Sequence, residues 1–314
     1  MKIVFFGTPE PAAQILQKII ATEHRVLAVV TQPDRPCGRG QKVTFPPVKE
    51  SALKNQLTVL QPDNVRVTEF HSIIGAMKPE IAVVVAYGKI LPQELLAIPK
   101  FGFINLHASL LPKYRGAAPI QWALLNGEKE TGMTVFRLTE KLDDGSIITQ
   151  KKVRIKDDDD ATTLSKRLFS AGEKILLEAL DRIEKGEAEF RAQDETQVTY
   201  APLLTRESGA LDWRKSAPEI KNRIRALKPW PTAYTFYHGK RLKIFKAEDR
   251  VLDLALEKNL PGTIIHVLKG EGFIVATGHG DLLITEVQPE AGKKMKASDY
   301  ALGHDVKSGE VLPS

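Results

Sequence analysis

Short apolar runs that alternate with helical patterns are the feature that most limits how this chain can fold. Four such runs occur in the first half, at Lys2–Phe6, Val26–Val30, Ile81–Ala86 and Phe101–His107. The segment after the first run, 9–20, repeats apolar residues at helical spacing. Continuous runs of β-branched residues between helices are typical of parallel strands that helices cover on both faces. We therefore predict an α/β domain built on a mostly parallel sheet.

The second half of the chain has a different pattern. Short apolar runs there are separated by glycine-rich turns and follow one helical segment, Ser216–Leu227. The runs are Tyr234–Tyr237, Leu242–Phe245, Thr263–Val267, Phe273–Ala276 and Leu282–Val287. This pattern predicts a small antiparallel β-barrel or sandwich. Because 314 residues suffice for two domains of ordinary size, we assign an α/β domain to residues 1–188, a polar linker to 189–205 and the β-domain to 206–314.

The composition indicates a protein of a reducing compartment. A single cysteine, Cys37, excludes a disulfide within the chain and a zinc site built from several thiolates. The apolar run near the start ends at Gly7, and the longest later run, 81–86, is far shorter than the roughly 18 residues that a membrane span needs. We expect a cytoplasmic protein without a membrane segment.

The positive charge of the chain is concentrated in one region. The chain carries 45 Lys and Arg against 39 Asp and Glu, a net charge of +6. Residues 206–246 alone carry 11 basic and 3 acidic side chains, a net charge of +8. An excess of this size favours a polyanionic partner, nucleic acid first. A solvated surface of mixed charge is the alternative interpretation.

Residues 31–47 interrupt the alternation of strands and helices. They contain four prolines, two glycines and the cationic side chains Arg35, Arg39 and Lys42. Proline and glycine at this density predict a long loop with no helix or strand of its own. Loops of more than about 12 residues inside a compact domain are usually functional or disordered. The charge leaves both a nucleic-acid contact and a solvated surface open.

Asn105 and His107 are polar positions in an otherwise apolar strand. Because strand side chains alternate, both project to one face while Ile104 and Leu106 face the other way. A loop with proline and glycine, 109–116, follows at once, so the pair lies near the carboxyl end of a parallel strand. Open α/β sheets form their ligand crevice at this edge. We predict a functional site there, and a purely structural histidine is the alternative.

A carboxylate partner for His107 is available in the turn 141–145, at Asp143 or Asp144. Aspartate before glycine is also ordinary turn chemistry, so the spacing leaves open whether either one is functional. The Gly7–Pro9 turn lacks the G-x-G-x-x-G pattern of dinucleotide binding, and the chain has no P-loop, H-E-x-x-H or C-x-x-C motif. We therefore predict neither a nicotinamide cofactor nor a metal.

The central motifs resemble those of the folate-dependent formyltransferases. They are Asn105-Leu-His107, Ser109-Leu-Leu-Pro112, Tyr114-Arg-Gly-Ala-Ala-Pro-Ile-Gln121, Glu130-Thr-Gly-Met-Thr134 and Leu142-Asp143. Further matches resemble the branch of the family that acts on tRNA, among them Phe6-Gly-Thr-Pro9, Thr31-Gln-Pro-Asp-Arg-Pro36, Gln193-Asp-Glu195, Val198-Thr-Tyr200 and Pro229-Trp-Pro231. One departure is Asp144-Gly145-Ser146, where the family commonly has Thr-Gly-Asp.

This resemblance implies a Rossmann-like catalytic domain followed by an OB-like β-barrel that binds tRNA. The implied reaction moves the formyl group of 10-formyltetrahydrofolate, a co-substrate, to the α-amino group of initiator methionyl-tRNA. Asn105 and His107 would stabilise the oxyanion, and His107 with Asp143 would move the proton. A monomer that needs no metal and no membrane is implied as well.

The resemblance also implies which residues contact the two substrates. The tetrahydrofolate site would be lined by Ser109, Leu110, Leu111 and Pro112. The tRNA would meet the 31–47 segment, with Arg39 as the main contact and Arg35 and Lys42 beside it.

Two other functions fit part of the pattern. A formyltransferase that acts on an amino-sugar nucleotide would share the Asn-x-His and Ser-Leu-Leu-Pro motifs, but it would need neither the cationic 31–47 segment nor a basic second domain. A noncatalytic RNA-binding or folate-sensing protein would keep the fold without the chemistry. The presence of Asn105, His107 and Asp143 argues against that second alternative.

Overall fold

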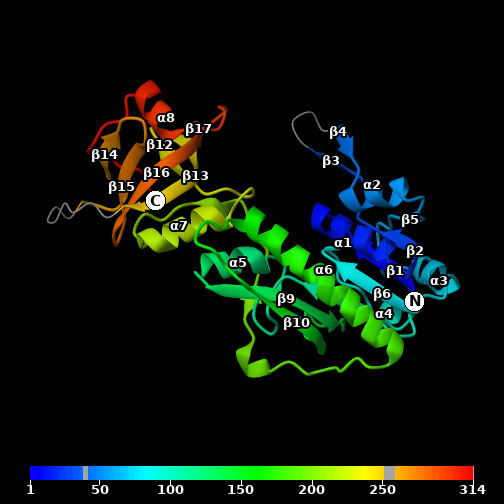
Figure 1. Cartoon of the computed structure of the whole chain (residues 1–314). Helices are drawn as coiled ribbons and strands as arrows, with labels where there is room; N and C mark the ends of the chain where they lie inside the picture. Colours follow the sequence, from blue (N-terminus) through cyan, green and yellow to red (C-terminus); the bar gives the residue numbers. More distant parts are fainter. Residues whose placement is uncertain (38–41, 251–258, 314) are drawn as a thin grey trace. The chain divides into compact units, whose positions relative to one another are not determined.

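The chain divides into two compact units. The computed structural model describes residues 1–37, 42–250 and 259–313 (Figure 1). Unit 1 comprises Met1–Pro119, Glu130–Arg154 and Ser165–Ala201, and unit 2 comprises Ile120–Lys129, Ile155–Leu164 and Pro202–Ser314. The internal segments Ile120–Lys129 and Ile155–Leu164 therefore belong to the same unit as the C-terminal residues. No pattern in the sequence predicted this grouping. The predicted domain limits at residues 188 and 205 stay predictions.

Unit 1 is built on a seven-stranded sheet with the strand order β10-β9-β7-β6-β1-β2-β5. The strands are β1 (Lys2–Gly7), β2 (Arg25–Val30), β5 (Val59–Leu60), β6 (Ile81–Val85), β7 (Phe103–His107), β9 (Glu130–Arg137) and β10 (Ile147–Arg154). Strands β7 to β5 are parallel, whereas β9 and β10 join antiparallel. The predicted mostly parallel sheet is confirmed. Because the chain extends the sheet first to one side of β1 and then to the other, a crevice is expected at the carboxyl ends of the central strands.

Helices cover both faces of this sheet. Phe6 of β1 packs with Phe70 of α3 (Thr68–Ala76) and with Leu95 of α4 (Gln93–Leu96). On the other face, Gly172 of α6 (Ala161–Lys185) lies so close to Leu106 that an added Cβ would be 3.1 Å from its side chain. Three more helices begin in unit 1: α1 (Glu10–Ile20), α2 (Pro47–Lys54) and α5 (Pro119–Leu125). The helix α6 begins in a segment of unit 2 and continues into unit 1.

The prediction that residues 31–47 lack secondary structure is wrong in part. β3 (Arg35–Cys37) pairs with β4 (Lys42–Thr44) as a short antiparallel ribbon, and α2 begins at Pro47. Proline excludes a central strand because it has no N–H to donate, but each strand of a two-stranded ribbon has an unpaired edge where proline is tolerated. Proline is also favoured in the first turn of a helix. Counting prolines therefore missed both elements.

Unit 2 contains a six-stranded antiparallel sheet with the order β12-β13-β16-β15-β14, and β17 pairs with β16. The strands are β12 (Tyr234–Tyr237), β13 (Lys240–Arg250), β14 (Ile264–Leu268), β15 (Gly272–Ala276), β16 (Asp281–Pro289) and β17 (Met295–Lys296). Each of the five predicted strands is present, and the predicted antiparallel β-domain is confirmed. Shorter elements complete the chain: β8 (Arg115–Gly116), β11 (Tyr200–Ala201), and the 3-10 turns at Glu195–Gln197 and Glu207–Gly209.

The core of unit 2 is apolar and includes a fully buried tryptophan. Trp213 packs among the inward side chains of the sheet, and its Nε1 donates a 3.2 Å hydrogen bond to the hydroxyl of Thr235. The helix α7 (Ala217–Ala226) begins with a capping box formed by Ser216 and Glu219, and α8 (Ala297–Gly303) contributes further to the core. In the described part of the chain, no helix is long and apolar enough to cross a membrane.

Candidate active site

The polar pair at the end of β7 lies as the strand alternation requires. Asn105 and His107 occupy alternate positions of β7, and Leu106 between them faces α6. His107 is buried and Asn105 is half-buried. Among the described residues the Asn105 amide has no hydrogen-bond partner, so its two N–H groups and its oxygen are available to a ligand.

The contacts of His107 define which nitrogen carries a proton. Its Nε2 lies 2.9 Å from the backbone oxygen of Tyr114. Because a carbonyl oxygen only accepts hydrogen bonds, we infer that Nε2 carries a proton. Nδ1 lies 3.7 Å from Oδ2 of Asp143, and the ring meets Phe136 edge to face. The imidazole is thus held at one nitrogen and faces a carboxylate with the other.

Of the two aspartates in the turn, Asp143 is the one that faces His107. Asp143 has a left-handed backbone with φ of +50°, and its buried Oδ2 accepts a 2.8 Å hydrogen bond from the backbone N–H of Gly116. Asp144 instead accepts a hydrogen bond from the hydroxyl of Thr139. The structure therefore brings Asp143 and His107 together, and their catalytic roles stay predictions.

The segment predicted to line the folate site, Ser109–Pro112, is held firmly beside His107. The buried Ser109 hydroxyl donates to the backbone oxygen of Lys113 at 2.6 Å, and the Thr134 hydroxyl donates to the backbone oxygen of Ser109 at 2.7 Å. The backbone oxygen of Leu111 accepts from Nε2 of Gln150 at 2.8 Å. The loop is therefore rigid, and its contact with folate stays a prediction.

The predicted tRNA contacts are described only in part. Arg35 is exposed at the start of β3, and Lys42 is the first residue of β4, where it pairs with Cys37. Arg39 lies outside the described residues. The interaction of these three residues with tRNA stays a prediction.

Three further residues that no pattern in the sequence singled out surround the site. Arg115 is buried, Gln193 donates to the backbone oxygen of Asp143, and Thr199 accepts from the backbone N–H of Tyr114. All three lie within motifs that resemble the formyltransferases. No local periodicity, however, indicates that the segment predicted as a linker reaches the loop that carries Asp143.

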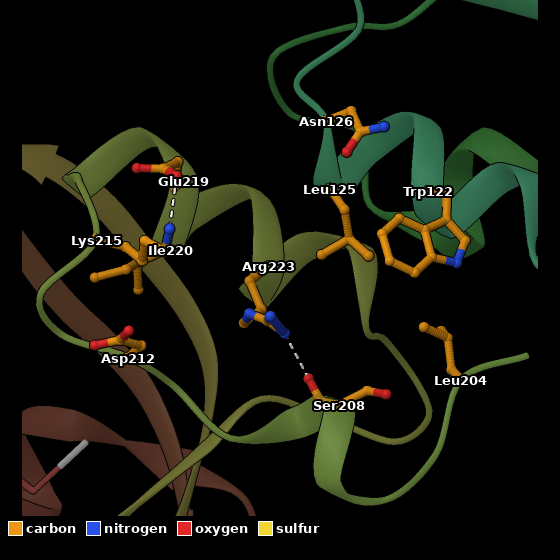
Figure 2. Close-up of a pocket in the computed structure, with 10 residues that line it drawn as sticks. All are labelled: Trp122, Leu125, Asn126, Leu204, Ser208, Asp212, Lys215, Glu219, Ile220 and Arg223. Carbon is orange, nitrogen blue, oxygen red and sulfur yellow. Dashed lines mark hydrogen bonds and ion pairs between the residues drawn. The ribbon is translucent and has the colours of Figure 1, made fainter. Parts of the chain in front are cut away.

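A cavity in unit 2 contains none of the predicted site residues (Figure 2). Its volume is about 370 Å³, and Trp122 of α5 and Arg223 of α7 contribute to its lining. Arg223 donates to the backbone oxygen of Ser208 at 2.7 Å. Two cationic and two carboxylate side chains line this cavity, so its charge favours neither an anionic nor a cationic ligand. They are Lys215, Arg223, Asp212 and Glu219.

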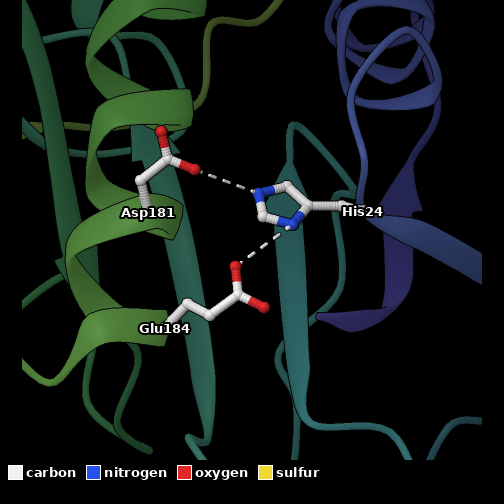
Figure 3. Close-up of side chains that lie close together, drawn as sticks. All are labelled: His24, Asp181 and Glu184. Atoms are coloured by element: carbon white, nitrogen blue, oxygen red, sulfur yellow. Dashed lines mark ion pairs between the residues drawn. The ribbon is translucent and has the colours of Figure 1, made fainter.

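One group of candidate metal ligands occurs among the described residues, formed by His24, Asp181 and Glu184 (Figure 3). Asp181 faces Nε2 of the imidazole at 3.6 Å, whereas Glu184 faces Nδ1 at 3.8 Å. A metal ion binds one imidazole nitrogen, so the two carboxylates do not converge on one ion. The amino group of Met1 pairs with Glu184 at 2.9 Å and lowers the pKa of that carboxyl through this hydrogen bond. We interpret the group as an ion-pair cluster.

Comparison with known proteins finds relatives over the whole chain. The formyl transferase family matches residues 1–180, and the C-terminal domain of formyl transferases matches residues 203–305. The methionyl-tRNA formyltransferase of Bacillus subtilis is 46% identical over 99% of this chain and 97% of its own length. The methionyl-tRNA formyltransferase of Caldicellulosiruptor saccharolyticus is 48% identical over 99% of this chain and 100% of its own length.

Solved structures of much lower identity share the fold. HypX from Aquifex aeolicus in complex with tetrahydrofolic acid is 18% identical, with a TM-score of 0.67 over 100% of this chain and 49% of that one. An N-formyltransferase from Helicobacter canadensis in complex with folinic acid and dTDP-3-aminofucose is 21% identical, with a TM-score of 0.66 over 94% of this chain and 100% of that one.

Proposed function

The chain belongs to the methionyl-tRNA formyltransferase family of enzymes, and we propose that it transfers the formyl group of 10-formyltetrahydrofolate to the α-amino group of initiator methionyl-tRNA. The product would be the formylated tRNA that starts translation. The observation that carries the proposal is a free Asn105 amide on the same strand as an imidazole that faces a buried carboxylate. We propose that the enzyme acts as a monomer in the cytoplasm.

The first step is attack of the amine nitrogen on the formyl carbon. A C–N bond forms, and the carbonyl electron pair moves onto oxygen, which becomes an oxyanion on a tetrahedral carbon. The Asn105 amide stays neutral at any ordinary pH and is free to donate a hydrogen bond to this oxygen. A fixed donor of this kind lowers the barrier because it does not have to reorient during the reaction.

His107 moves the proton in this proposal. The attacking amine loses a proton, and the N10 nitrogen of the folate gains one when its bond to the formyl carbon breaks. Because Nε2 donates to the backbone oxygen of Tyr114, Nδ1 is the atom that accepts and returns the proton. The imidazolium formed in between lies beside the Asp143 carboxylate, which stabilises its charge. In that state the protonated Nδ1 also donates a hydrogen bond to the oxyanion, in addition to the one from Asn105.

Binding of the two substrates is assigned to separate parts of the chain. The folate would lie against the rigid Ser109–Pro112 segment, beside His107. Arg35, Arg39 and Lys42 would contact the acceptor end of the tRNA. The excess charge of residues 206–246 would bind further phosphates, so affinity for tRNA should fall steeply as the salt concentration rises.

Transfer of labelled formyl from 10-formyltetrahydrofolate by the purified protein tests this function. We expect label on methionyl-tRNA and none on uncharged tRNA or free methionine, because the reaction needs the amine of the charged tRNA. An amino-sugar nucleotide serves as a fourth acceptor. Label on that nucleotide, with none on methionyl-tRNA, would overturn the proposal in favour of the sugar-modifying alternative.

A further inference from the structure

Residues 191–201, which we name the strap, contact the active site although they lie beyond the predicted catalytic domain. We propose that Gln193 of the strap is a positioning residue, whose amide holds the loop 141–145 so that Asp143 faces His107. This inference rests on the proposed function because it concerns the same reaction.

The amide of Gln193 bonds to the loop twice. Its Nε2 donates to the backbone oxygens of Asp143 and of Gly145, each at 2.8 Å. The two oxygens lie on either side of Asp144 in the chain. One side chain therefore fixes the backbone on both sides of the turn. Hydrogen bonds to the backbone, rather than to the carboxylate, leave the Asp143 side chain free to face the imidazole.

Arg115 determines which way the Gln193 amide points. Its Nε and Nη2 donate to Oε1 of Gln193 at 3.1 and 2.9 Å. Because a guanidinium only donates, Oε1 has to face Arg115, and Nε2 then has to face the two backbone oxygens. Glu195 accepts from Nη2 of the buried Arg115 at 2.6 Å, and this hydrogen bond lowers the pKa of the Glu195 carboxyl. The charged pair therefore persists at neutral pH and keeps the amide in one orientation.

The loop needs an external support because its backbone is strained and tightly packed. The backbone of Asp143 has a φ of +50°, which residues other than glycine rarely adopt. An added Cβ at Gly145 would lie 1.7 Å from the backbone oxygen of Arg137, so no larger residue fits there. Without the Gln193 amide, the two backbone oxygens would lose the hydrogen bonds that Nε2 donates to them.

The same strap supports the other side of the imidazole. The hydroxyl of Thr199 accepts from the backbone N–H of Tyr114 at 2.9 Å, and the backbone oxygen of Thr199 accepts from the N–H of Arg115 at 2.9 Å. Tyr114 also has a left-handed backbone, with φ of +61°, and its carbonyl holds Nε2 of His107. Both partners of His107 therefore depend on one segment.

The test compares two glutamines of the strap in the full-length protein. Gln193→Ala removes both hydrogen bonds to the loop, whereas Gln197→Ala removes an amide that bonds to Asp194 within the strap. We expect kcat of Gln193→Ala to fall roughly 10²-fold, because a displacement of about 1 Å at a reacting group costs that much. KM for both substrates and Tm should change little, and Gln197→Ala should keep the kcat of the unaltered protein.

A second variant, Gln193→Glu, separates positioning from stability. It keeps an acceptor for Arg115, but it has no donor for the two backbone oxygens. Its ion pair with Arg115 should offset the repulsion between its second carboxylate oxygen and those two oxygens, so we expect Tm to be maintained. We expect its kcat to fall as in Gln193→Ala. The proposal is overturned if Gln193→Glu keeps full kcat, or if kcat of Gln193→Ala stays within about twofold of that of the unaltered protein. It is also overturned if the loss of kcat in either variant is accompanied by a higher KM or a lower Tm of the same variant.

The unaltered protein distinguishes the two proposals. If it transfers no formyl group to methionyl-tRNA, the proposed function fails, and the role of Gln193 fails with it. If it transfers the group and Gln193→Ala does so equally fast, only the role of Gln193 is refuted.

Discussion

Unit 1 and unit 2 use their buried polar groups in different ways. In unit 1 the buried His107 and Asp143 face one another, and the nearby Asn105 amide has no hydrogen-bond partner within residues 1–37, 42–250 and 259–313. In unit 2 the buried hydroxyls of Thr232 and Thr235 donate to backbone oxygens. Hydrogen bonds of that kind stabilise a fold but leave nothing for a ligand. The contrast supports our proposal that the chemistry takes place in unit 1.

Unit 2, in contrast, is distinguished by the basic segment of its sequence. Unit 2 contains the whole of the strongly basic segment 206–246. The outward face of its hairpin carries Arg241 over the ring of Tyr234 at 4.3 Å, with Phe236 beside them. Cations next to aromatic rings suit a nucleic-acid partner. We therefore expect changes at Asn105, His107 and Asp143 of unit 1 to act on rate and changes on the basic face of unit 2 to act on affinity.

The largest effect should come from removing the oxyanion donor. Asn105→Ala should lower kcat by roughly 10²- to 10³-fold, because a fixed hydrogen bond to the developing charge is lost. Single-turnover formyl transfer measures the rate, and filter binding measures tRNA affinity, which should stay unchanged. Asn64→Ala, at an exposed asparagine of the same unit, is the control. Equal losses of rate and affinity in Asn105→Ala would contradict the division of roles.

A moderate effect should come from the basic face of unit 2. Arg241→Ala and Lys243→Ala should each weaken tRNA binding and reduce the slope of log affinity against log salt by roughly 0.7 to 0.9, because one phosphate contact is lost. The rate at saturating tRNA should not change. Lys166→Ala, at an exposed lysine of α6, is the matched control. A variant of unit 2 that slows transfer at saturation would refute the assignment of unit 2 to affinity alone.

The smallest effect concerns Asp281, a half-buried carboxylate of unit 2. Burial raises the pKa of Asp281 above its usual value of 3.8. The folded state therefore favours the protonated form, and the associated stability is present below pH 4 and lost as pH rises through the raised pKa. Asp281→Asn, which cannot ionise, should match the unaltered Tm at pH 4 and exceed it at pH 7 by about 2 °C at most.

The exposed Asp305, with a side chain 84% accessible, supplies the control for that measurement. Asp305→Asn should show no gain in Tm between pH 4 and pH 7. A gain of the same size in both variants would mean that net charge, and not the burial of one carboxyl in unit 2, causes the effect.

Much of unit 1 could be predicted from local pattern, and the exceptions have a physical reason. Parallel strands buried on both faces are continuous apolar runs, which is why β1, β2, β6 and β7 were evident. No strand was predicted for β10, because the exposed Lys151 and Lys152 interrupt its apolar residues. Antiparallel strands at the edge of a sheet lack the signal that central strands have.

The candidate site could likewise be predicted only where its residues are close in sequence. Alternation along one strand suffices to pair Asn105 with His107. Local spacing does not distinguish Asp143 from Asp144, and the structure shows that the Asp143 carboxylate is the one that faces the imidazole. Gln193 lies 50 residues beyond Asp143, and no periodicity connects a turn with a distant segment. Contacts across such separations follow from the tertiary fold alone.

The place of the strap in the chain also has a consequence for how the protein is made. A ribosome synthesises the strand and loop that carry His107 and Asp143 well before it reaches Thr199. Until then the backbone of Tyr114 and the turn at Asp143 have none of the hydrogen bonds that the strap supplies. A growing polypeptide therefore completes the proposed active site only when nearly two thirds of its length has been translated.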